Sequence, residues 1–395
     1  MLIQIILFIF LGIFSGTISG LIPGIHINLV AVFLVSLSTN LFYSTNPIYF
    51  VIFITALAIT HTFLDFVPSI FLGAPDSDTE LSVLPGHEML KNGNGYQAIY
   101  FSVVGGLIGI FLLLIFSFPL ILIIPKIYNL IKNLIPYILI LTCLFTIFSG
   151  KNKFKSFFVF LLAGILGWCV LNLGLKEPLL PMLTGLFGAS TLIMSIKSKT
   201  KIPEQNCKEK IKTKFFKPAL ASFLISPLSI FLPALGSGQL AMIANQISKS
   251  DRGEFLFLQG CINVLAMGFS FLALYTISKT RTGASVAIRE FVNIPTTKTF
   301  FLILFVIFIS GICAFFLSLF FAKIFARTIE KINYSKLSVC TLIFLTILVF
   351  IFSGISGILI LIISTFTGIY SIQLNVKRTN LMGCLLIPTI ILYLS

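Results

Sequence analysis

Long apolar runs free of Asp, Glu, Lys and Arg divide this chain. Six of them cover residues 1–64, 97–125, 218–248, 255–278, 299–322 and 337–376. A helix needs about 20 apolar residues to cross a bilayer, so each run can form at least one span. A soluble protein that buried these helices would have too little polar helix surface to cover so many. The pattern therefore predicts an all-α polytopic membrane protein with about 10–12 transmembrane segments.

Composition and charge support this prediction. Only 10% of the residues are charged, against about 25% in ordinary soluble domains. The net charge of +15 comes from basic residues in short loops between apolar runs, so it indicates topology and not a nucleic-acid partner. The densest basic group is expected on the cytoplasmic side, because positive loops favour that side. It consists of Lys197, Lys199, Lys201, Lys208, Lys210, Lys212, Lys214 and Lys217.

Two further features of the sequence narrow the class of protein. The first apolar run has no basic start and no small-residue cleavage site, so we interpret it as a retained helix and not as a secretory signal. The seven cysteines are scattered singly, which indicates neither a disulfide framework nor a thiolate metal site. We expect no cofactor apart from a coupling sodium ion.

Two interrupted helices stand out in the apolar pattern. If all basic loops lie on the cytoplasmic side of the membrane, residues 219–247 must enter and leave the membrane on the same side. The centre of this segment contains Pro233, Gly236 and Gly238, which break a helix partway across. A similar break, Pro23-Gly24, lies between two apolar arms near the N-terminus. We therefore predict two re-entrant helical hairpins.

The two hairpins divide the chain into related halves. An odd number of crossings separates them, so they open on opposite sides of the membrane, as in the inverted repeats of many secondary transporters. We expect a first half at 1–196, with hairpin 1 and a polar loop at 73–96, a basic cytoplasmic linker at 197–217, and a second half at 218–395 with hairpin 2. The alternative is two unrelated proline kinks, since Gly and Pro are common in membrane helices.

Broken helices indicate where a polar site lies. Hydrocarbon cannot satisfy exposed peptide groups, so such breaks persist only beside protein or a polar cavity. Helix N-termini that follow the breaks suit a carboxylate, and nearby carbonyl and side-chain oxygens suit sodium. For His26 and Asn28 the alternative is a hydrogen-bonded packing role. The expected substrate-binding residues at the two breaks are Pro23, Gly24, His26, Asn28, Pro233, Gly236, Ser237, Gly238 and Gln239.

Ionisable side chains in the first half suggest ion coupling. His61 and Asp65 are four residues apart and share a helix face. Such a pair at membrane depth is a functional hypothesis, for example proton or cation coupling. The alternative is that the pair lies at the interface and caps the helix before Pro68.

The polar loop at 73–96 is unusually acidic for so apolar a chain. Asp76 and its acidic neighbours favour hard cations, and the alternative is a solvated loop. The counterpart in the second half is basic and contains Asn263 and Arg281. Arg281 could pair with an anionic substrate or with lipid headgroups. The expected ion-coupling residues are His61, Asp65, Asp76 and Asn263.

Five motifs resemble one transporter family. They are Asp65-Phe-Val-Pro-Ser-Ile-Phe-Leu-Gly-Ala-Pro-Asp76, Leu84-Pro-Gly-His87, Gly93-Asn-Gly-Tyr-Gln-Ala98, Leu21-Ile-Pro-Gly24 and Leu232-Pro-Ala-Leu-Gly-Ser-Gly-Gln239. Together they resemble the large membrane subunit, or permease, of the tripartite tricarboxylate transporters in its shorter archaeal-type form. Ala234 stands where this family would have a glycine. The resemblance implies two hairpins in an inverted repeat, an elevator movement, a carboxylate substrate and cation coupling. In bacterial members it also implies a periplasmic binding protein and a small membrane subunit.

These observations lead to one main functional prediction and two alternatives. We expect a multi-pass cell-membrane protein, in contact with lipid, that transports small organic anions by using a sodium or proton gradient. It is not expected to be an enzyme, and the sequence has no nucleotide-binding motif. A homodimer is left open. One alternative is a metal-dependent membrane enzyme acting on a lipid-linked substrate through Asp76, Asp78, His61, His87 and Glu88. The other is a passive channel or structural subunit.

Overall fold

The computed structural model of the chain describes residues 2–22, 46–73, 79, 81–148, 152–175, 178–197, 202–207, 214–232, 236–330 and 334–394. Every regular element in these segments is a helix. Six of the predicted site residues lie outside the described residues, so their predicted roles stay predictions. They are Pro23, Gly24, His26, Asn28, Asp76 and Pro233.

The helices follow the apolar runs of the sequence. In the first half they are α1 (Leu2–Leu21), α3 (Pro47–Leu64), α4 (Phe66–Phe71), α5 (Val83–Lys91), α6 (Gly95–Ile131), η1 (Lys132–Leu134), α7 (Ile135–Phe148), α8 (Lys153–Leu171), α9 (Leu179–Leu183), η2 (Thr184–Ala189) and α10 (Ser190–Lys197). In the second half they are α11 (Phe216–Ile225), α12 (Leu228–Phe231), α13 (Ser237–Ser248), α14 (Arg252–Ile277), α15 (Gly283–Val292), α16 (Thr297–Ile329), α17 (Tyr334–Gln373), η3 (Arg378–Met382) and α18 (Gly383–Leu394).

The lengths of these helices confirm a polytopic α-helical membrane protein. Within the described residues, seven helical stretches are long and apolar enough to cross a bilayer, and they involve α1, α3–α4, α6, α8, α14, α16 and α17. Four shorter apolar stretches accompany them. The re-entrant position of the two hairpins in a membrane stays a prediction.

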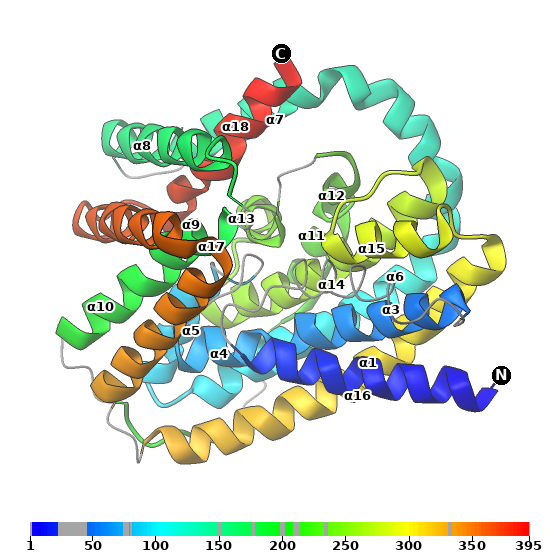
Figure 1. The fold of residues 1–395 in the computed structure, drawn as a ribbon, viewed down its shortest axis with the longest axis horizontal. Helices are drawn as coiled ribbons and strands as arrows, with labels where there is room; N and C mark the ends of the chain where they lie inside the picture. The colour runs from blue at the N-terminus through cyan, green and yellow to red at the C-terminus, as the bar shows by residue number, and fades with distance from the viewer. Residues whose placement is uncertain are drawn as a thin grey trace.

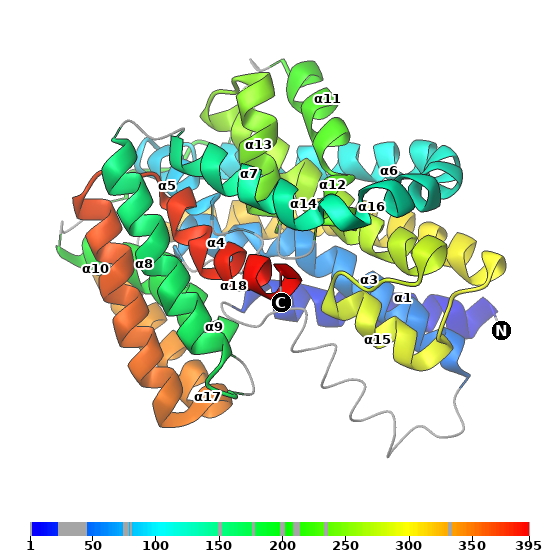
Figure 2. The same cartoon turned by 90° about the horizontal axis from the view of Figure 1, so that it is seen from above.

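The described helices gather into two groups (Figures 1 and 2). One contains α1, α3, α6, α14 and α16, with α15 and the helical hairpin α11–α13 against it. The other contains α8, α9, η2, α10, α17, η3 and α18. The long α6 and the following α7 lead from the first group to the second (Figure 1). One connection between the groups is the contact of η3 with α13.

Glycines allow the helices of the first group to approach closely. A Cβ added to Gly16 of α1 would lie 2.6 Å from the carbonyl oxygen of Leu57 on α3. On α14, a Cβ added to Gly260 would lie 1.9 Å from the carbonyl oxygen of Ser102 on α6. Helices in lipid gain little from apolar burial and associate through such close contacts of small residues. Both helix pairs therefore depend on the absence of a side chain at these glycines.

The contacts between the halves follow an exchange pattern. Suppose that α3, α5 and α6 of the first half correspond to α14, α15 and α16 of the second half. The packing of α3 on α16 then has its counterpart in the packing of α14 on α6. Likewise, α15 packing on α3 matches α5 packing on α14. The pairs α3–α14 and α6–α16, which also pack, map onto themselves. A two-fold relation between the halves would produce this pattern, and both that relation and the opposite membrane orientation of the halves stay predictions.

The linker between the halves contacts the turn that precedes α6. The Gln205 side chain accepts a hydrogen bond from the backbone N–H of Gly95 at 2.8 Å and donates to the carbonyl oxygen of Leu90 at 3.1 Å. The backbone N–H of Asn206 donates to the carbonyl oxygen of Gly93 at 2.8 Å. Gly93 has a φ of +76°, a conformation that favours glycine. Residues 202–207 thus anchor the linker to the first half.

Three helix interruptions shape the rest of the fold. The first separates α12 from α13, at the predicted hairpin 2. The second is η2, which has π-helical geometry. The third is Gly354 inside α17, with φ 63° and ψ −158°, a conformation accessible essentially only to glycine. It divides α17 into a first limb (residues 334–353) and a second limb (residues 355–373).

Candidate functional site

The N-terminal end of α13 forms the centre of the candidate site. Helices α11 and α13 pack side by side, and the chain between α12 and α13 connects them. At 12 residues, α13 is about 18 Å long, well short of the ~30 Å hydrocarbon thickness. Gly236 precedes it in an extended conformation and provides no side-chain cap. The first N–H groups of α13 therefore need partners from outside the helix, and its dipole favours an anion there.

Four buried polar side chains lie at this end of α13 and along the facing stretch of α14. We call Ser237, Gln239, Gln259 and Asn263 the amide cluster; their exposed fractions are 2%, 3%, 0% and 4%. The Nε2 atom of Gln259 donates to the Oγ atom of Ser237 at 3.5 Å. Gln259 and Asn263 are four residues apart and so share one face of α14. The cluster thus joins the broken helix to a through-going one.

Part of the amide cluster has unused hydrogen-bonding capacity. Both amide atoms of Gln239 and the Nδ2 atom of Asn263 make no hydrogen bond with any described residue. Leaving a buried polar group unsatisfied costs about 1–3 kcal/mol. Buried polar groups are satisfied in most proteins, so such exceptions call for a physical explanation. A bound polar ligand or ion would supply the missing partners.

Arg281 lies beside the same helix break. Its Nε atom donates to the carbonyl oxygen of Ile230 in α12 at 2.7 Å. This carbonyl belongs to the C-terminal end of a short helix, where the dipole favours a cation. The contact stabilises the break and differs from both roles expected for Arg281. A guanidinium carries five N–H groups, so a substrate contact stays a prediction for this residue.

The pair His61 and Asp65 is buried inside a long helical stretch, with exposed fractions of 3% and 4%. The Oγ atom of Ser19 on α1 lies 3.0 Å from Nδ1 of His61. The chain continues through Asp65 into α4, so Asp65 does not terminate the helical stretch before Pro68. Their burial fits the intramembrane location that ion coupling needs, and that role itself stays a prediction.

A second polar region lies where α5 meets the other helix group. His87 on α5 lies against Gly73, whose added Cβ would be 2.5 Å from His87 Nε2 and 3.5 Å from Leu192 on α10. Burial, and then the charges of Lys91 and Arg378, lower the pKa of His87 to about 3. His87 is therefore neutral at physiological pH.

Arg378 satisfies the π-helical turn η2. Its Nη2 atom lies 2.8 Å from the carbonyl oxygens of Leu186 and Phe187 and from the Oγ atom of Ser190. Nη1 donates to the Thr191 hydroxyl. The guanidinium also lies over the Phe187 ring, 5.3 Å from its centroid. This cation therefore satisfies carbonyls of the helix break through its two Nη atoms, while its Nε atom makes no hydrogen bond with a described residue.

Sequence reasoning missed Gln259 and Arg378. Gln259 could have been found, because it is a polar residue four positions before Asn263 inside an apolar run. Arg378 carries no such signal, since it follows an apolar run next to Lys377, where a basic residue indicates only topology. Its role depends on η2, which is remote in sequence.

The described residues contain no group of three or more His, Cys, Asp or Glu side chains that could hold a metal ion. His61 lies against α1, whereas His87 lies near α10, so these two candidates for an enzyme site contact different helices. Asp76 and Asp78 are outside the described residues.

The long apolar helices, the break before α13 and the buried polar side chains beside it define a helical membrane protein as the class. The chain matches the family described as "Tripartite tricarboxylate transporter TctA family" over residues 6–383. It is also 33% identical over 386 residues to an uncharacterized protein of Methanocaldococcus jannaschii, with 94% of each chain covered. No solved structure matches the chain. The chain belongs to the tripartite tricarboxylate transporter TctA family.

Family membership confirms the resemblance seen in the sequence and a multi-pass location in the membrane. The chain is thus a membrane component of a transporter, and a family of tripartite transporters implies further subunits, such as a binding protein and a small membrane subunit. The family does not favour the metal-dependent enzyme. The substrate and the coupling ion are subjects of the proposal below.

Proposed function

We propose that this protein is the permease of a secondary active transporter for small organic anions of the carboxylate class. A carboxylate binds at the N-terminal end of α13, where helix N–H groups, Gln239 and Asn263 provide donors. Sodium or protons supply the driving force, and no catalytic chemistry takes place. The two hairpins form the substrate site, and one group of helices moves against the other.

The observation that supports this proposal most directly is the unsatisfied amide of Gln239. It is 3% exposed, it lies in the first turn of α13, and neither of its amide atoms has a hydrogen-bond partner among the described residues. The amide nitrogen of Gln239 can donate to a carboxylate, and its oxygen can accept from a protonated group or ligate a cation. A structural amide would be expected to bond to the chain itself, as that of Gln205 does.

The direct test measures ligand binding to the purified chain, because the proposed site lies within this chain. Purified protein in detergent would be heated with a panel of mono-, di- and tricarboxylates that includes citrate, and the shift of the unfolding temperature recorded. A ligand at 100 times its Kd stabilises the folded state by about 2.7 kcal/mol. Gln239→Leu should weaken binding of the effective carboxylate about tenfold, since it removes a hydrogen bond to a charged group.

A matched control lies at the other end of α13. Asn245 caps that end, where its Oδ1 atom accepts from the backbone N–H of Ser250 at 3.0 Å. Asn245→Leu should leave carboxylate affinity unchanged. Equal affinities for the native protein and Gln239→Leu would remove the amide cluster from the site. The absence of a shift with every carboxylate would contradict the proposed substrate class.

Ion coupling is tested separately in proteoliposomes. If Asp65 couples a cation, Asp65→Asn should abolish the dependence of uptake on a sodium or proton gradient while leaving folded protein. Asp251→Asn is the control, because Asp251 caps α14 at an exposed position and Asn caps helices equally well. Unchanged gradient dependence in Asp65→Asn would exclude this carboxylate as the coupling group.

A further inference from the structure

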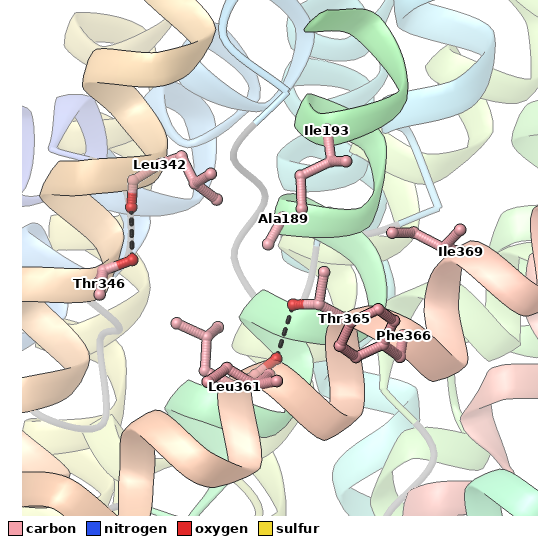
Figure 3. A pocket seen from close by; sticks show the side chains of 9 residues that line it. Ala189, Ile193, Leu342, Thr346, Leu361, Thr365, Phe366 and Ile369 are labelled. Carbon is pink, nitrogen blue, oxygen red and sulfur yellow. Dashed lines mark hydrogen bonds between the residues drawn. The ribbon is translucent and has the colours of Figure 1, made fainter. Parts of the chain in front are cut away.

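A cavity of about 440 Å³ lies between α10 and the two limbs of α17, outside the amide cluster (Figure 3). Ala189 and Ile193 line it from η2 and α10, Leu342 and Thr346 from the first limb, and Thr365 and Phe366 from the second limb. The bend at Gly354 creates this space, because it turns the second limb away from the first. The cavity is therefore built into the fold of this helix group.

The cavity offers almost no hydrogen-bonding capacity. The hydroxyl of Thr346 donates to the carbonyl oxygen of Leu342 at 2.8 Å, and that of Thr365 donates to the carbonyl oxygen of Leu361 at 2.6 Å (Figure 3). The remaining lining side chains are hydrocarbon. A ligand inside the cavity must therefore be apolar itself, because a polar group would lose its partners in water.

The mouth of the cavity opens on a strongly apolar surface. Phe366 is 68% exposed and Ile362 is 47% exposed, and both line the cavity. On α17 they continue a face of exposed side chains that includes Ile355 and Leu359. In a membrane protein, a long apolar helix face of this kind contacts lipid hydrocarbon. The cavity is thus accessible to acyl chains.

Positive charge lies at one end of the same helices. Ala189 packs with Val349, and one turn later Leu192 packs with Leu345, so α10 and the first limb run antiparallel. The C-terminal end of α10, with Lys197, therefore lies at the same end as the start of α17, with Lys336. Both lysines are exposed, and the positive-inside bias places them on the cytoplasmic side.

We propose that this cavity binds an anionic phospholipid, with one acyl chain between α10 and the two limbs of α17 and its headgroup at Lys197 and Lys336. The apolar lining selects the hydrocarbon chain, and the lysines select a negative headgroup from the cytoplasmic leaflet, where anionic lipids lie. This site is independent of the carboxylate site at α13 and does not rest on the proposed function.

The test uses tryptophan fluorescence quenched by brominated lipids. The chain has one tryptophan, Trp168, so Trp168→Phe gives a silent background. Phe366→Trp then reports from the mouth of the cavity, and Phe316→Trp on α16 is the matched control, because the two phenylalanines are 68% and 65% exposed. Each protein would be reconstituted in the same mixture of phosphatidylglycerol and phosphatidylcholine twice, once with only phosphatidylglycerol brominated and once with only phosphatidylcholine brominated.

We expect Phe366→Trp to show a preference for phosphatidylglycerol of roughly fivefold per lysine, the size typical of a lysine near an anionic membrane surface. Phe316→Trp should show a ratio near one. Adding Lys197→Gln and Lys336→Gln to the Phe366→Trp protein should bring its ratio near one. Thr346→Phe, which fills the cavity, should also abolish the preference while both lysines remain.

Two outcomes would overturn the proposal. Equal preferences at the two reporter positions would show only exchange with bulk lipid. Loss of quenching by both lipids at Phe366→Trp, with normal quenching at Phe316→Trp, would show that protein covers the cavity, as in a dimer of this chain.

Discussion

Two helix breaks in this protein use arginine in different ways. At η2, the guanidinium of Arg378 contacts two backbone carbonyls and two hydroxyls, so the chain itself supplies donors to the carbonyls of the break. At the break between α12 and α13, Arg281 donates to one carbonyl, that of Ile230. The amide of Gln239 on the other side of this break has no partner among the described residues.

The difference distinguishes a structural break from a functional one. A break whose carbonyls the protein itself satisfies fixes the helix geometry, and at η2 the Nε atom of Arg378 is the one guanidinium nitrogen without a partner among the described residues. At a break with buried, unsatisfied donors, a ligand that accepts their hydrogen bonds gains binding free energy. Interrupted helices alone therefore do not locate a transport site, and hydrogen-bond accounting is needed to choose between them.

The largest effect is expected at Arg378. Arg378→Met removes every contact of the guanidinium and leaves the carbonyls of Leu186 and Phe187 without this donor. Loss of hydrogen bonds to a charged group typically costs about 1.5–3 kcal/mol. Thermal unfolding in detergent should show this loss, with a smaller loss for Arg378→Lys, whose single ammonium cannot match the planar fork. Lys377→Met, at the exposed neighbouring position, should have little effect. Equal stability of Arg378→Met and native protein would make η2 independent of Arg378.

His87 should give this Arg378 region a pH dependence. Its pKa is about 3 in the folded protein and about 6.5 when unfolded. Between these values the unfolded chain takes up a proton that the folded protein does not, so stability falls as the pH drops below 6.5. At pH 5 the loss is about 2 kcal/mol. Unfolding temperatures from pH 7.5 to 5 should therefore drop more steeply in the native protein than in His87→Asn.

The control for this pH dependence is Lys91→Gln. It removes one nearby positive charge and leaves the burial of His87, which is the largest cause of the pKa shift, intact. Most of the pH dependence should persist. Parallel pH curves for native protein and His87→Asn would contradict the assignment to His87.

The smallest effect is expected at Arg281. Arg281→Met removes one charge-assisted hydrogen bond from a partly exposed side chain, so the loss of stability should be about 1 kcal/mol. Lys279→Met, two residues away and exposed, serves as the control for loss of charge. A loss as large as that of Arg378→Met would show that the two breaks depend equally on their arginines and would remove the contrast between them.

Much of the fold could be predicted from the sequence. The charge-free runs at 97–125 and 299–322 became α6 and α16, because in lipid every peptide group must bond within its own helix. The helix breaker at Gly236 and Gly238 likewise predicted the start of α13. Gly354 was missed, because one glycine in a long apolar run does not distinguish a bend from a straight helix.

The candidate site could be predicted only in part. Ser237, Gln239 and Asn263 were identified as polar residues at breaks or inside spans, and the structure places Ser237 and Gln239 at the start of α13 and Asn263 on the α14 face that also carries Gln259. The direct contact of Gln259 with Ser237 could not be predicted, since it depends on how α13 packs on α14. The same limit applies to the contact of Arg281 with α12.

By itself, the sequence determined that this chain lies in a membrane, which of its segments form long apolar helices, and which family it belongs to. These properties depend on local composition and on short motifs, which hydrocarbon and helix geometry translate directly into structure. Only the tertiary structure decided which break is satisfied by Arg378, which one leaves Gln239 unsatisfied, and where α10 and α17 enclose a cavity. Hydrogen bonds and cavities between remote segments depend on packing, which a linear pattern of residues does not specify.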